Sequence, residues 1–155
     1  GIAAQTVADI LDTIEAVDRY IVDLGGNIAV GGKGEKPFII GIRDPKAPDE
    51  IIGKFSMEKG YACATAGDYQ RFFVADGVRY HHIIDPKTGY PARGLSAVIV
   101  VALDATIADI LSTALFVMGY EEGMTYLETN PEIRAVFFDG EGKLLGGNLE
   151  IKIDG

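Results

Sequence analysis

The stretch Tyr80-His-His-Ile-Ile-Asp-Pro-Lys-Thr-Gly-Tyr-Pro91 leads from a strand-like apolar segment into a turn rich in Asp, Pro, Thr and Gly. Both histidines of the protein, His81 and His82, stand side by side in it, just before an Asp-Pro corner. Loops that end strands are where a rigid scaffold can aim reactive side chains, and histidine exchanges protons near neutral pH. Because neighbouring strand side chains point to opposite faces, only one of the two histidines can face a given site.

A β-hairpin is predicted immediately upstream of the two histidines. Strand-like residues 72–75 and 78–81 flank Asp76-Gly77, a dipeptide typical of the type I′ turn that joins two antiparallel strands. The histidines are therefore expected at the end of the second arm of this hairpin.

Apolar periodicity of 3.6 predicts three helices. The first covers residues 3–17, with a stripe formed by Val7, Ile10, Leu11, Ile14 and Val17. The second covers residues 105–119, with Asp104 as N-cap, Gly119 as its stop and a core-facing stripe formed by Ile107, Leu111, Leu115 and Met118. A shorter helix is expected over residues 121–129, ended by Asn130-Pro131.

The other elements are predicted as strands. They are expected at residues 20–24, 38–43, 51–55, 61–65, 95–103, 133–138 and 149–153. The near-continuous apolar run at 38–43 suggests burial on both faces, and 95–103 fits an interior strand. Together these elements predict one α+β domain over residues 1–155, a largely antiparallel sheet with one layer of helices.

Composition narrows the classes of partner. The 155 residues are 48% hydrophobic and 24% charged, as in an ordinary globular protein with a sizeable core. A net charge of −9 argues against nucleic acid or an anionic membrane surface, since both are bound by pooled Lys and Arg. The single cysteine, Cys63, excludes an internal disulfide, and its apolar neighbours predict a buried thiol and not a nucleophile.

A carboxylate and a hydroxyl lie four residues apart on the predicted helix 105–119. Asp109 and Thr113 share one face there, so their oxygens could meet one hard cation. Mg²⁺ is usually held by one or two protein oxygens, waters and substrate phosphates. The alternative is a solvated Asp109 and a Thr113 that bonds back to its own helix.

His82 also has two interpretations. It could be a general base oriented by Asp85 and the amides of the following turn, or a strand histidine whose ring is satisfied by Asp85 or a neighbouring carbonyl. His81 is the weaker candidate. The turn Gly25-Gly26-Asn27, after strand 20–24, either brings backbone close to a ligand or is only a tight turn.

Five motifs in register across almost the whole chain resemble the FAD:protein FMN transferase family, the ApbE-type flavin transferases. They are Asp23–Asn27, Gly41–Pro45, Ala64–Tyr69, His82–Pro91 and Ala108–Gly119. Members of this family split FAD with Mg²⁺, pass the FMN phosphate to a threonine or serine hydroxyl of a target protein, and release AMP. Some members instead hydrolyse FAD to FMN and AMP.

The resemblance implies a role for each matched residue. Asp109, Thr113 and the carbonyl of Ala3 would hold Mg²⁺ beside the FAD pyrophosphate. His82, assisted by Asp85, would take the proton from the attacking hydroxyl. The flavin nucleotide would be contacted by Gly25, Gly26, Asn27, Thr65, Gly67, Asp68, Tyr69, His82 and Ile83. The targets implied are flavoprotein subunits of membrane redox complexes, and the implied location is exported, periplasmic or lipid-anchored.

The chain departs from the family pattern in three ways. Ala4-Gln5-Thr6 stands where members usually have Lys-Gly-Tyr, and Ala66 stands where they usually have Ser. The resemblance covers the carboxyl-terminal half of a typical member, and the chain starts at Gly1, which suggests a processed chain or a fragment. Two alternatives to a transferase therefore stay open: a protein that holds FAD without turnover, and an FAD pyrophosphatase.

Overall fold

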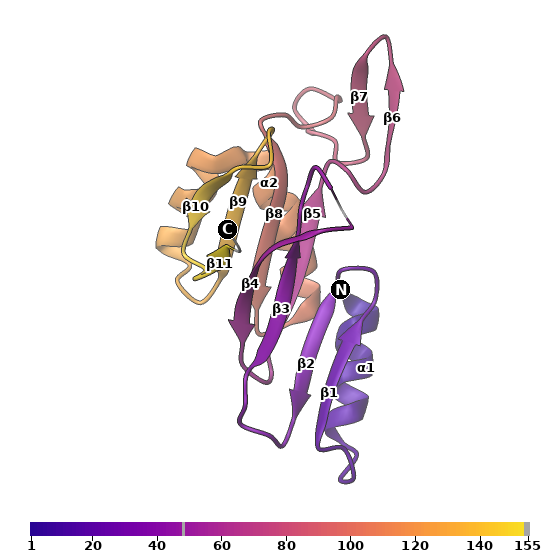
Figure 1. The fold of residues 1–155 in the computed structure, drawn as a ribbon, viewed down its shortest axis with the longest axis vertical. Coiled ribbons are helices and arrows are strands. Elements are labelled where there is room, and N and C mark those ends of the chain that lie inside the picture. The colour runs from indigo at the N-terminus through magenta and orange to yellow at the C-terminus, as the bar shows by residue number, and fades with distance from the viewer. Residues whose placement is uncertain (48, 154–155) are drawn as a thin grey trace.

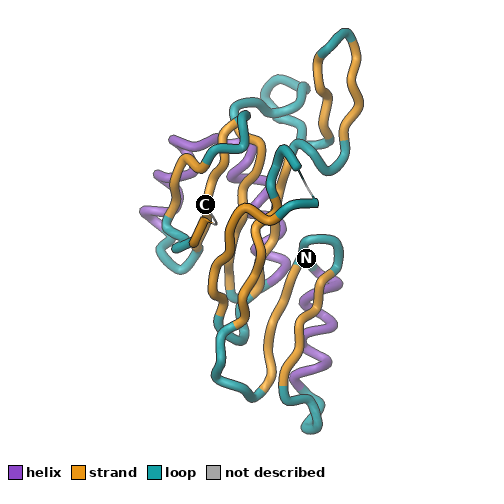
Figure 2. The backbone as a smooth tube through the Cα atoms, viewed as in Figure 1, coloured by secondary structure: helices purple, strands orange, loops and turns teal. Residues whose placement is uncertain are grey.

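A computed structural model describes residues 1–47 and 49–153 (Figures 1 and 2). This part of the chain contains two helices, α1 (Ile2–Asp12) and α2 (Ala105–Thr129). Its strands are β1 (Arg19–Asp23), β2 (Ile28–Gly32), β3 (Phe38–Arg43), β4 (Ile51–Met57), β5 (Ala62–Gly67), β6 (Phe72–Ala75), β7 (Val78–His81), β8 (Leu95–Ala102), β9 (Arg134–Asp139), β10 (Leu144–Gly147) and β11 (Lys152–Ile153). None of its helices combines the length and the apolarity needed to span a membrane.

The strands form three antiparallel sheets. The largest has the order β1-β2-β5-β8-β9-β10, the second has the order β11-β4-β3, and β6 and β7 pair only with each other among the described residues. The predicted α+β class and the antiparallel pairing are confirmed. The prediction of a single layer of helices on the sheet was incomplete. Helix α2 covers one face of the large sheet, and the β11-β4-β3 sheet covers the other face (Figure 1).

Strand β8 lies at the centre of this three-layer stack. Val98 and Val100 face α2, where they join the cluster that contains Phe116. Ile99 and Val101 face the small sheet, where they join the cluster that contains Phe55. All residues of β8 are buried, so the predicted interior strand is confirmed.

Strand β3 differs from its prediction. Phe38, Ile40 and Ile42 are buried, but the side chains between them are exposed, with Ile39 63% exposed. The small sheet has a core on one face only, so its strands keep the alternation of a half-buried strand. The prediction of burial on both faces is wrong.

Helix α1 buries a different face from the predicted stripe. Ala4 and Ala8 are buried, whereas Val7, Ile10 and Ile14 are exposed and Leu11 is partly buried. The small alanine side chains let the helix approach β1, β2 and the start of α2 closely. The helix also ends at Asp12 and does not reach residue 17.

Helix α2 follows its predicted boundaries. The Asp104 carboxylate accepts a hydrogen bond from the Ile107 amide at 2.9 Å, which confirms the N-cap. Gly119 has non-helical angles (φ 80°, ψ −178°), so α2 consists of two helical segments that meet where the stop was predicted. Leu115 is buried as predicted, but Ile107 and Met118 are exposed, and the buried positions around Leu115 include Ala108, Ser112 and Phe116.

The N-cap of α2 positions the turn that carries Asp109. Replacing Asp104 with alanine is expected to lower the free energy of unfolding by about 1 kcal/mol, because the Ile107 amide in the first turn of the helix loses its acceptor. Urea denaturation measures this loss. Asp104→Asn is the matched control, since asparagine also caps well; a loss in Asp104→Asn as large as that in Asp104→Ala would contradict the capping account.

The hairpin and the carboxyl-terminal strands complete the comparison with the prediction. Asp76 (φ 50°) and Gly77 (φ 76°) both have positive φ, as a type I′ turn requires, so the β6–β7 hairpin is confirmed. Strands β2 and β10 were not predicted. The expected strand 149–153 is limited to Lys152–Ile153, which pairs with β4 of the small sheet.

Candidate functional site

A cavity of about 640 Å³ lies between the large sheet and the small sheet. Its volume is within the range of small-molecule sites, roughly 300–1,000 Å³. Four predicted nucleotide-binding residues line it: Gly25, Gly26, Thr65 and Tyr69. The other five, Asn27, Gly67, Asp68, His82 and Ile83, are not part of its wall.

The glycine turn stands beside β5 because Ile28, the first residue of β2, pairs with Cys63. Gly25 (φ 70°) and Gly26 (φ 94°) both need the left-handed region, and the Asp23 carboxylate accepts the Gly26 amide hydrogen at 3.0 Å. A Cβ on either glycine would meet nothing within 4 Å. The backbone of the turn is therefore open to a ligand in the cavity.

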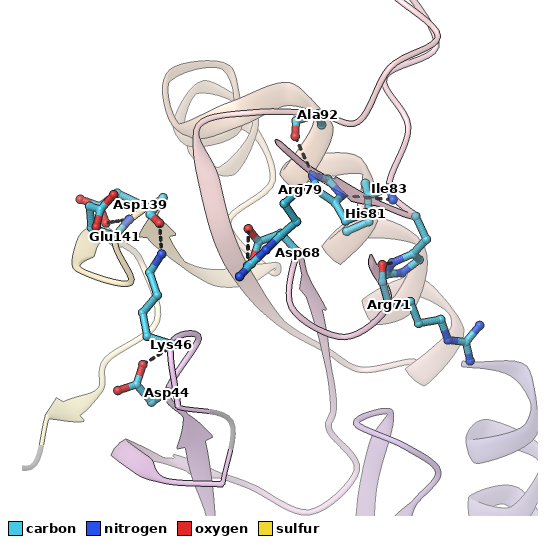
Figure 3. Close-up of polar contacts among 12 residues, drawn as sticks. Asp44, Lys46, Asp68, Arg71, Arg79, His81, Ile83, Ala92, Asp139 and Glu141 are labelled. Atoms are coloured by element: carbon cyan, nitrogen blue, oxygen red, sulfur yellow. Dashed lines mark hydrogen bonds and ion pairs between the residues drawn. The ribbon is translucent and has the colours of Figure 1, made fainter. Parts of the chain in front are cut away.

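Three of the predicted nucleotide-binding residues, Gly67, Asp68 and Tyr69, lie at the end of β5 and directly after it. A Cβ on Gly67 would lie 2.6 Å from the Tyr69 ring, so only glycine allows that ring to fold back over the strand. Burial raises the pKa of the Tyr69 phenol, which keeps it protonated at neutral pH. Asp68 forms an ion pair with Arg79 at 3.3 Å through Oδ2, while its buried Oδ1 has no hydrogen-bond partner among the described residues (Figure 3).

Cys63 also lines the cavity. The thiol is buried, as predicted, and this burial, with a smaller contribution from Asp23, raises its pKa to about 12. The thiol is thus protonated near neutral pH, which disfavours a nucleophilic role.

His81 is a buried structural histidine. Its Nε2 donates to the Ala92 carbonyl at 2.8 Å, and its Nδ1 accepts the Ile83 amide hydrogen at 3.3 Å (Figure 3). Its ring meets the Phe116 ring edge-on. These two bonds require the neutral ring with the proton on Nε2. Burial lowers the pKa of His81, which favours the same neutral form.

His82 is exposed and has its two ring nitrogens in different positions. Nδ1 donates to the Arg71 carbonyl at 3.3 Å, and the His82 backbone amide donates to the same oxygen at 3.2 Å. With the proton on Nδ1, the lone pair of Nε2 is available to accept a proton. The ring is therefore held by a neighbouring carbonyl, one of the partners that the sequence left open.

Arg71 is a functional candidate that the sequence reasoning missed. Its backbone carbonyl holds His82, while its side chain lines the cavity and extends away from buried His81 (Figure 3). Arg43 is the other arginine in the cavity wall. Two guanidinium groups in a chain of net charge −9 give this cavity local cations for an anionic ligand. In the sequence, only the position of Arg71 between Tyr69 and the hairpin could have identified it as a candidate.

Asp85 and Ile83 shape the turn after His82. Asp85 Oδ1 accepts the Lys87 amide hydrogen at 2.8 Å, and the Asp85 carbonyl accepts from Thr88 and Gly89. Ile83 is buried and donates its amide hydrogen to His81. The structure therefore gives both residues contacts within the turn, and it does not bring the Asp85 carboxylate into a hydrogen bond with the His82 ring.

Asp109 and Thr113 lie on the first turns of α2, against the start of α1. Asp109 Oδ2 accepts a hydrogen bond from the Gly1 ammonium at 2.7 Å, and the Asp109 side chain is 46% exposed. Thr113 is exposed one turn later, and no hydrogen bond back to its own helix is present among the described residues, in contrast to Ser112. Ala3, the third predicted oxygen, is in the first turn of α1.

This corner fits a hard cation in its donor chemistry. The Asp109 carboxylate and the Thr113 hydroxyl lie four residues apart on the same face of α2. No cluster of three or more His, Cys, Asp or Glu side chains suited to a metal exists in residues 1–47 and 49–153.

The metal candidates and the cavity are on opposite faces of the large sheet, so Asp109 and Thr113 are not part of the cavity wall. The histidine pair connects the two regions. His81 packs on Phe116, one turn beyond Thr113 and about 10 Å along the helix axis from Asp109. His82, next in sequence, is bonded to Arg71 of the cavity wall.

The model of the ApbE family matches residues 1–137 of the chain. The chain belongs to the ApbE family. The earlier resemblance to flavin transferases is thus confirmed at the level of the family.

Proteins similar to this ApbE-family chain include the FAD:protein FMN transferase of Treponema pallidum, 40% identical over 88% of this chain, and that of Vibrio cholerae, 38% identical over 84%. A crystal structure of the ApbE protein of Thermotoga maritima is 38% identical and superposes with a TM-score of 0.82 over 93% of this chain. The flavinyl transferase ApbE of Pseudomonas stutzeri, 35% identical, gives a TM-score of 0.70 over 92%.

The chain spans less than half the length of these relatives. It covers 41% of the Treponema protein and 40% of the Vibrio protein, and 47% of the Thermotoga chain. The relatives' activity is therefore taken to this ApbE-family chain only as a proposal.

The stability of this ApbE-family chain is expected to depend on pH through His81. Burial lowers the pKa of His81 in the folded state below 6.5, so at pH values between the folded pKa and 6.5 the unfolded state binds more protons. The stabilisation is complete above pH 6.5 and is lost as the pH falls towards the folded pKa. Urea denaturation between pH 7.5 and 5 should show a smaller loss of stability in His81→Gln than in the unchanged protein; an equal loss would contradict this assignment.

Proposed function

We propose that this chain is the flavin-transferring part of an FAD:protein FMN transferase. A threonine or serine hydroxyl of an acceptor protein attacks the phosphorus of the FMN moiety of FAD. The bond from that phosphorus to the bridging oxygen breaks, AMP leaves with that oxygen, and a phosphoester links FMN to the acceptor. The proton of the attacking hydroxyl goes to His82.

One observation carries this proposal. Arg71 lines the cavity, and its carbonyl holds the His82 ring. A guanidinium that can bind phosphate and an imidazole that can accept a proton are therefore neighbours at the edge of the cavity. In-line phosphoryl transfer needs little more from a protein than an oriented nucleophile and charge compensation. The names of the 35–40% identical relatives support the same reaction.

The described residues have separable roles in this proposal. The guanidinium groups of Arg71 and Arg43 bind pyrophosphate oxygens, and the open backbone of Gly25 and Gly26 approaches the nucleotide. His82 Nε2 accepts the proton from the acceptor hydroxyl while Nδ1 stays on the Arg71 carbonyl. Asp109, Thr113 and the Ala3 carbonyl, which lie outside the cavity wall, would hold Mg²⁺.

Replacing Arg71 with methionine is expected to weaken FAD binding about 10- to 100-fold. A charge-assisted hydrogen bond contributes about 1.5–3 kcal/mol, and each 1.4 kcal/mol is a factor of ten. Quenching of flavin fluorescence measures the affinity. Arg134→Met is the matched control, because Arg134 lines the second cavity and pairs with Glu58; equal weakening in both variants would contradict the assignment.

The reaction itself is tested by incubating the chain with FAD, Mg²⁺ and a threonine-bearing peptide. The proposal predicts flavin covalently on the peptide, detected by fluorescence and mass, together with free AMP. Release of AMP and FMN without labelled peptide would instead identify a pyrophosphatase. Intact, bound FAD would identify a binding protein.

A further inference from the structure

The β6–β7 hairpin and the two residues that flank it form one structural unit. The hairpin projects from the body of the molecule as a separate two-stranded sheet (Figure 1). Phe72 pairs with His81 at its base, and the next pair is closed by the His82 amide, which donates to the Arg71 carbonyl at 3.2 Å. The proposed proton acceptor and the arginine of the cavity wall therefore both belong to this hairpin unit, residues 71–82.

An ion pair joins the hairpin unit to the large sheet. Arg79 of β7 donates through Nη1 to Asp68 Oδ2 at 3.3 Å, and Asp68 directly follows β5 (Figure 3). The Asp68 amide in turn donates to the Ser96 carbonyl of β8 at 3.0 Å. Among the described residues, no other ion pair links the hairpin unit to the rest of the chain.

Strand β7 is thus held at two different heights. At its end, His81 donates to the Ala92 carbonyl at 2.8 Å, and two residues earlier Arg79 is held by Asp68. The Arg79 guanidinium also lies over the Phe72 ring of β6, 4.4 Å from its centroid, so it is packed against both arms of the hairpin. One contact would let the hairpin pivot about its base, whereas two contacts fix its orientation.

The burial of Asp68 distinguishes this ion pair from a surface pair. The Asp68 side chain is 17% exposed, and its buried Oδ1 has no hydrogen-bond partner in the part of the chain that the structure describes. A buried polar atom without a partner is destabilising, and such atoms are rare in folded proteins. The pair of Arg134 and Glu58 has the same length, 3.3 Å, but Glu58 is 60% exposed, so solvent screens it more strongly.

We propose that Asp68 is a positioning residue: by holding Arg79 it fixes the orientation of the hairpin unit and so places the His82 ring at the edge of the cavity. This inference rests on the proposed transferase function. Asp68 is not part of the cavity wall, so it acts through Arg79 and not on the nucleotide. This role differs from the nucleotide contact that the family resemblance implies for Asp68.

The first test measures the orientation of the hairpin without any reaction. Residual dipolar couplings of the backbone amides are recorded for the unchanged chain, Asp68→Asn, Arg79→Gln and the control Glu58→Gln. In the unchanged chain and the control, one alignment tensor should describe β5, β8 and the hairpin. In Asp68→Asn and Arg79→Gln, the hairpin couplings should depart from the tensor that still describes β5 and β8. Hairpin couplings that fit this tensor in both variants would overturn the proposal.

The second test measures whether the orientation matters for the reaction. At saturating FAD, Asp68→Asn and Arg79→Gln should each lower single-turnover FMN transfer about tenfold, because a small displacement of a reacting group is costly. The double variant should be no slower than the slower single variant, since both changes break the same contact. Glu58→Gln should stay within about twofold of the unchanged protein, because an exposed pair contributes little. An equal loss in Glu58→Gln and Asp68→Asn would contradict the proposal.

The third test separates positioning from general damage to the structure. If Asp68 acts by placing the His82 ring, its replacement has nothing left to misplace once that ring is removed. Asp68→Asn should therefore change the residual transfer of His82→Ala by less than about twofold. A further loss of about tenfold in the His82→Ala background would overturn the positioning role.

Failure of the proposed function gives a different pattern. If no form of the chain acts on FAD, the transferase assignment fails and the positioning role fails with it, while the dipolar couplings still decide whether Asp68 orients the hairpin. If the unchanged chain transfers FMN and Asp68→Asn transfers it equally fast, only the positioning role fails.

Discussion

Replacing His82 with alanine is expected to lower FMN transfer to a peptide hydroxyl by about 10²–10⁴-fold. The hydroxyl is a weak nucleophile until a positioned base takes its proton, and His82 Nε2 is free to do so while Nδ1 is held by the Arg71 carbonyl. Single-turnover formation of labelled peptide, with FAD saturating, measures the loss at the chemical step.

Two controls separate a base from a structural role for His82. FAD affinity should change less than about threefold, because the His82 ring is not part of the cavity wall. Added imidazole should restore part of the transfer rate in His82→Ala, since a small base can enter the space of the missing ring. Transfer within threefold of the unchanged protein would contradict the role of His82.

Replacing Asp109 with alanine is expected to abolish metal-dependent turnover while the fold stays intact. Asp109 is the only carboxylate in the proposed ligand set, and the neutral oxygens of Thr113 and Ala3 alone hold Mg²⁺ weakly. The Asp109 side chain is partly exposed, so its replacement should lower the free energy of unfolding by no more than about 1 kcal/mol. AMP release with Mg²⁺ and with EDTA measures the effect.

Matched variants test whether the loss of turnover comes from the lost carboxylate charge and from lost metal binding. Asp109→Asn keeps the shape and should lose turnover as Asp109→Ala does, whereas Thr113→Val should lose about tenfold, as expected for one removed ligand of several. Titration with Mg²⁺ by calorimetry should show binding to the unchanged chain and none to Asp109→Ala. Unchanged turnover in Asp109→Ala would refute the metal site.

Local signals in the sequence predicted local structure well. Asp76-Gly77, Asp104 and Gly119 each determine a turn, a cap or a break through their own backbone preferences, and each acts as predicted. The face that an element buries depends on what packs against it. Isoleucines of α1 stay exposed because only alanines fit the close contact with β1 and β2, and β3 alternates because, within residues 1–47 and 49–153, no layer covers its outer face.

The candidate site was likewise predictable only where local motifs mark its residues. The glycine turn at Gly25 and the residues Thr65 and Tyr69 carry motifs, and the structure brings them to one cavity. The cavity itself forms between two sheets whose packing no motif encodes. Arg71 was missed because its contact with His82 uses a backbone carbonyl, which every residue has.

The location of FAD tests the central claim most directly. Titrating FAD into the ¹⁵N-labelled chain is expected to shift the amides of Gly25, Gly26 and Thr65 together, in a saturable manner, and to leave Ser56 and Leu149 of the second, 460 Å³ cavity unchanged. Shifts confined to Ser56 and Leu149, or no saturable shift at the glycine turn, would contradict the proposed nucleotide site.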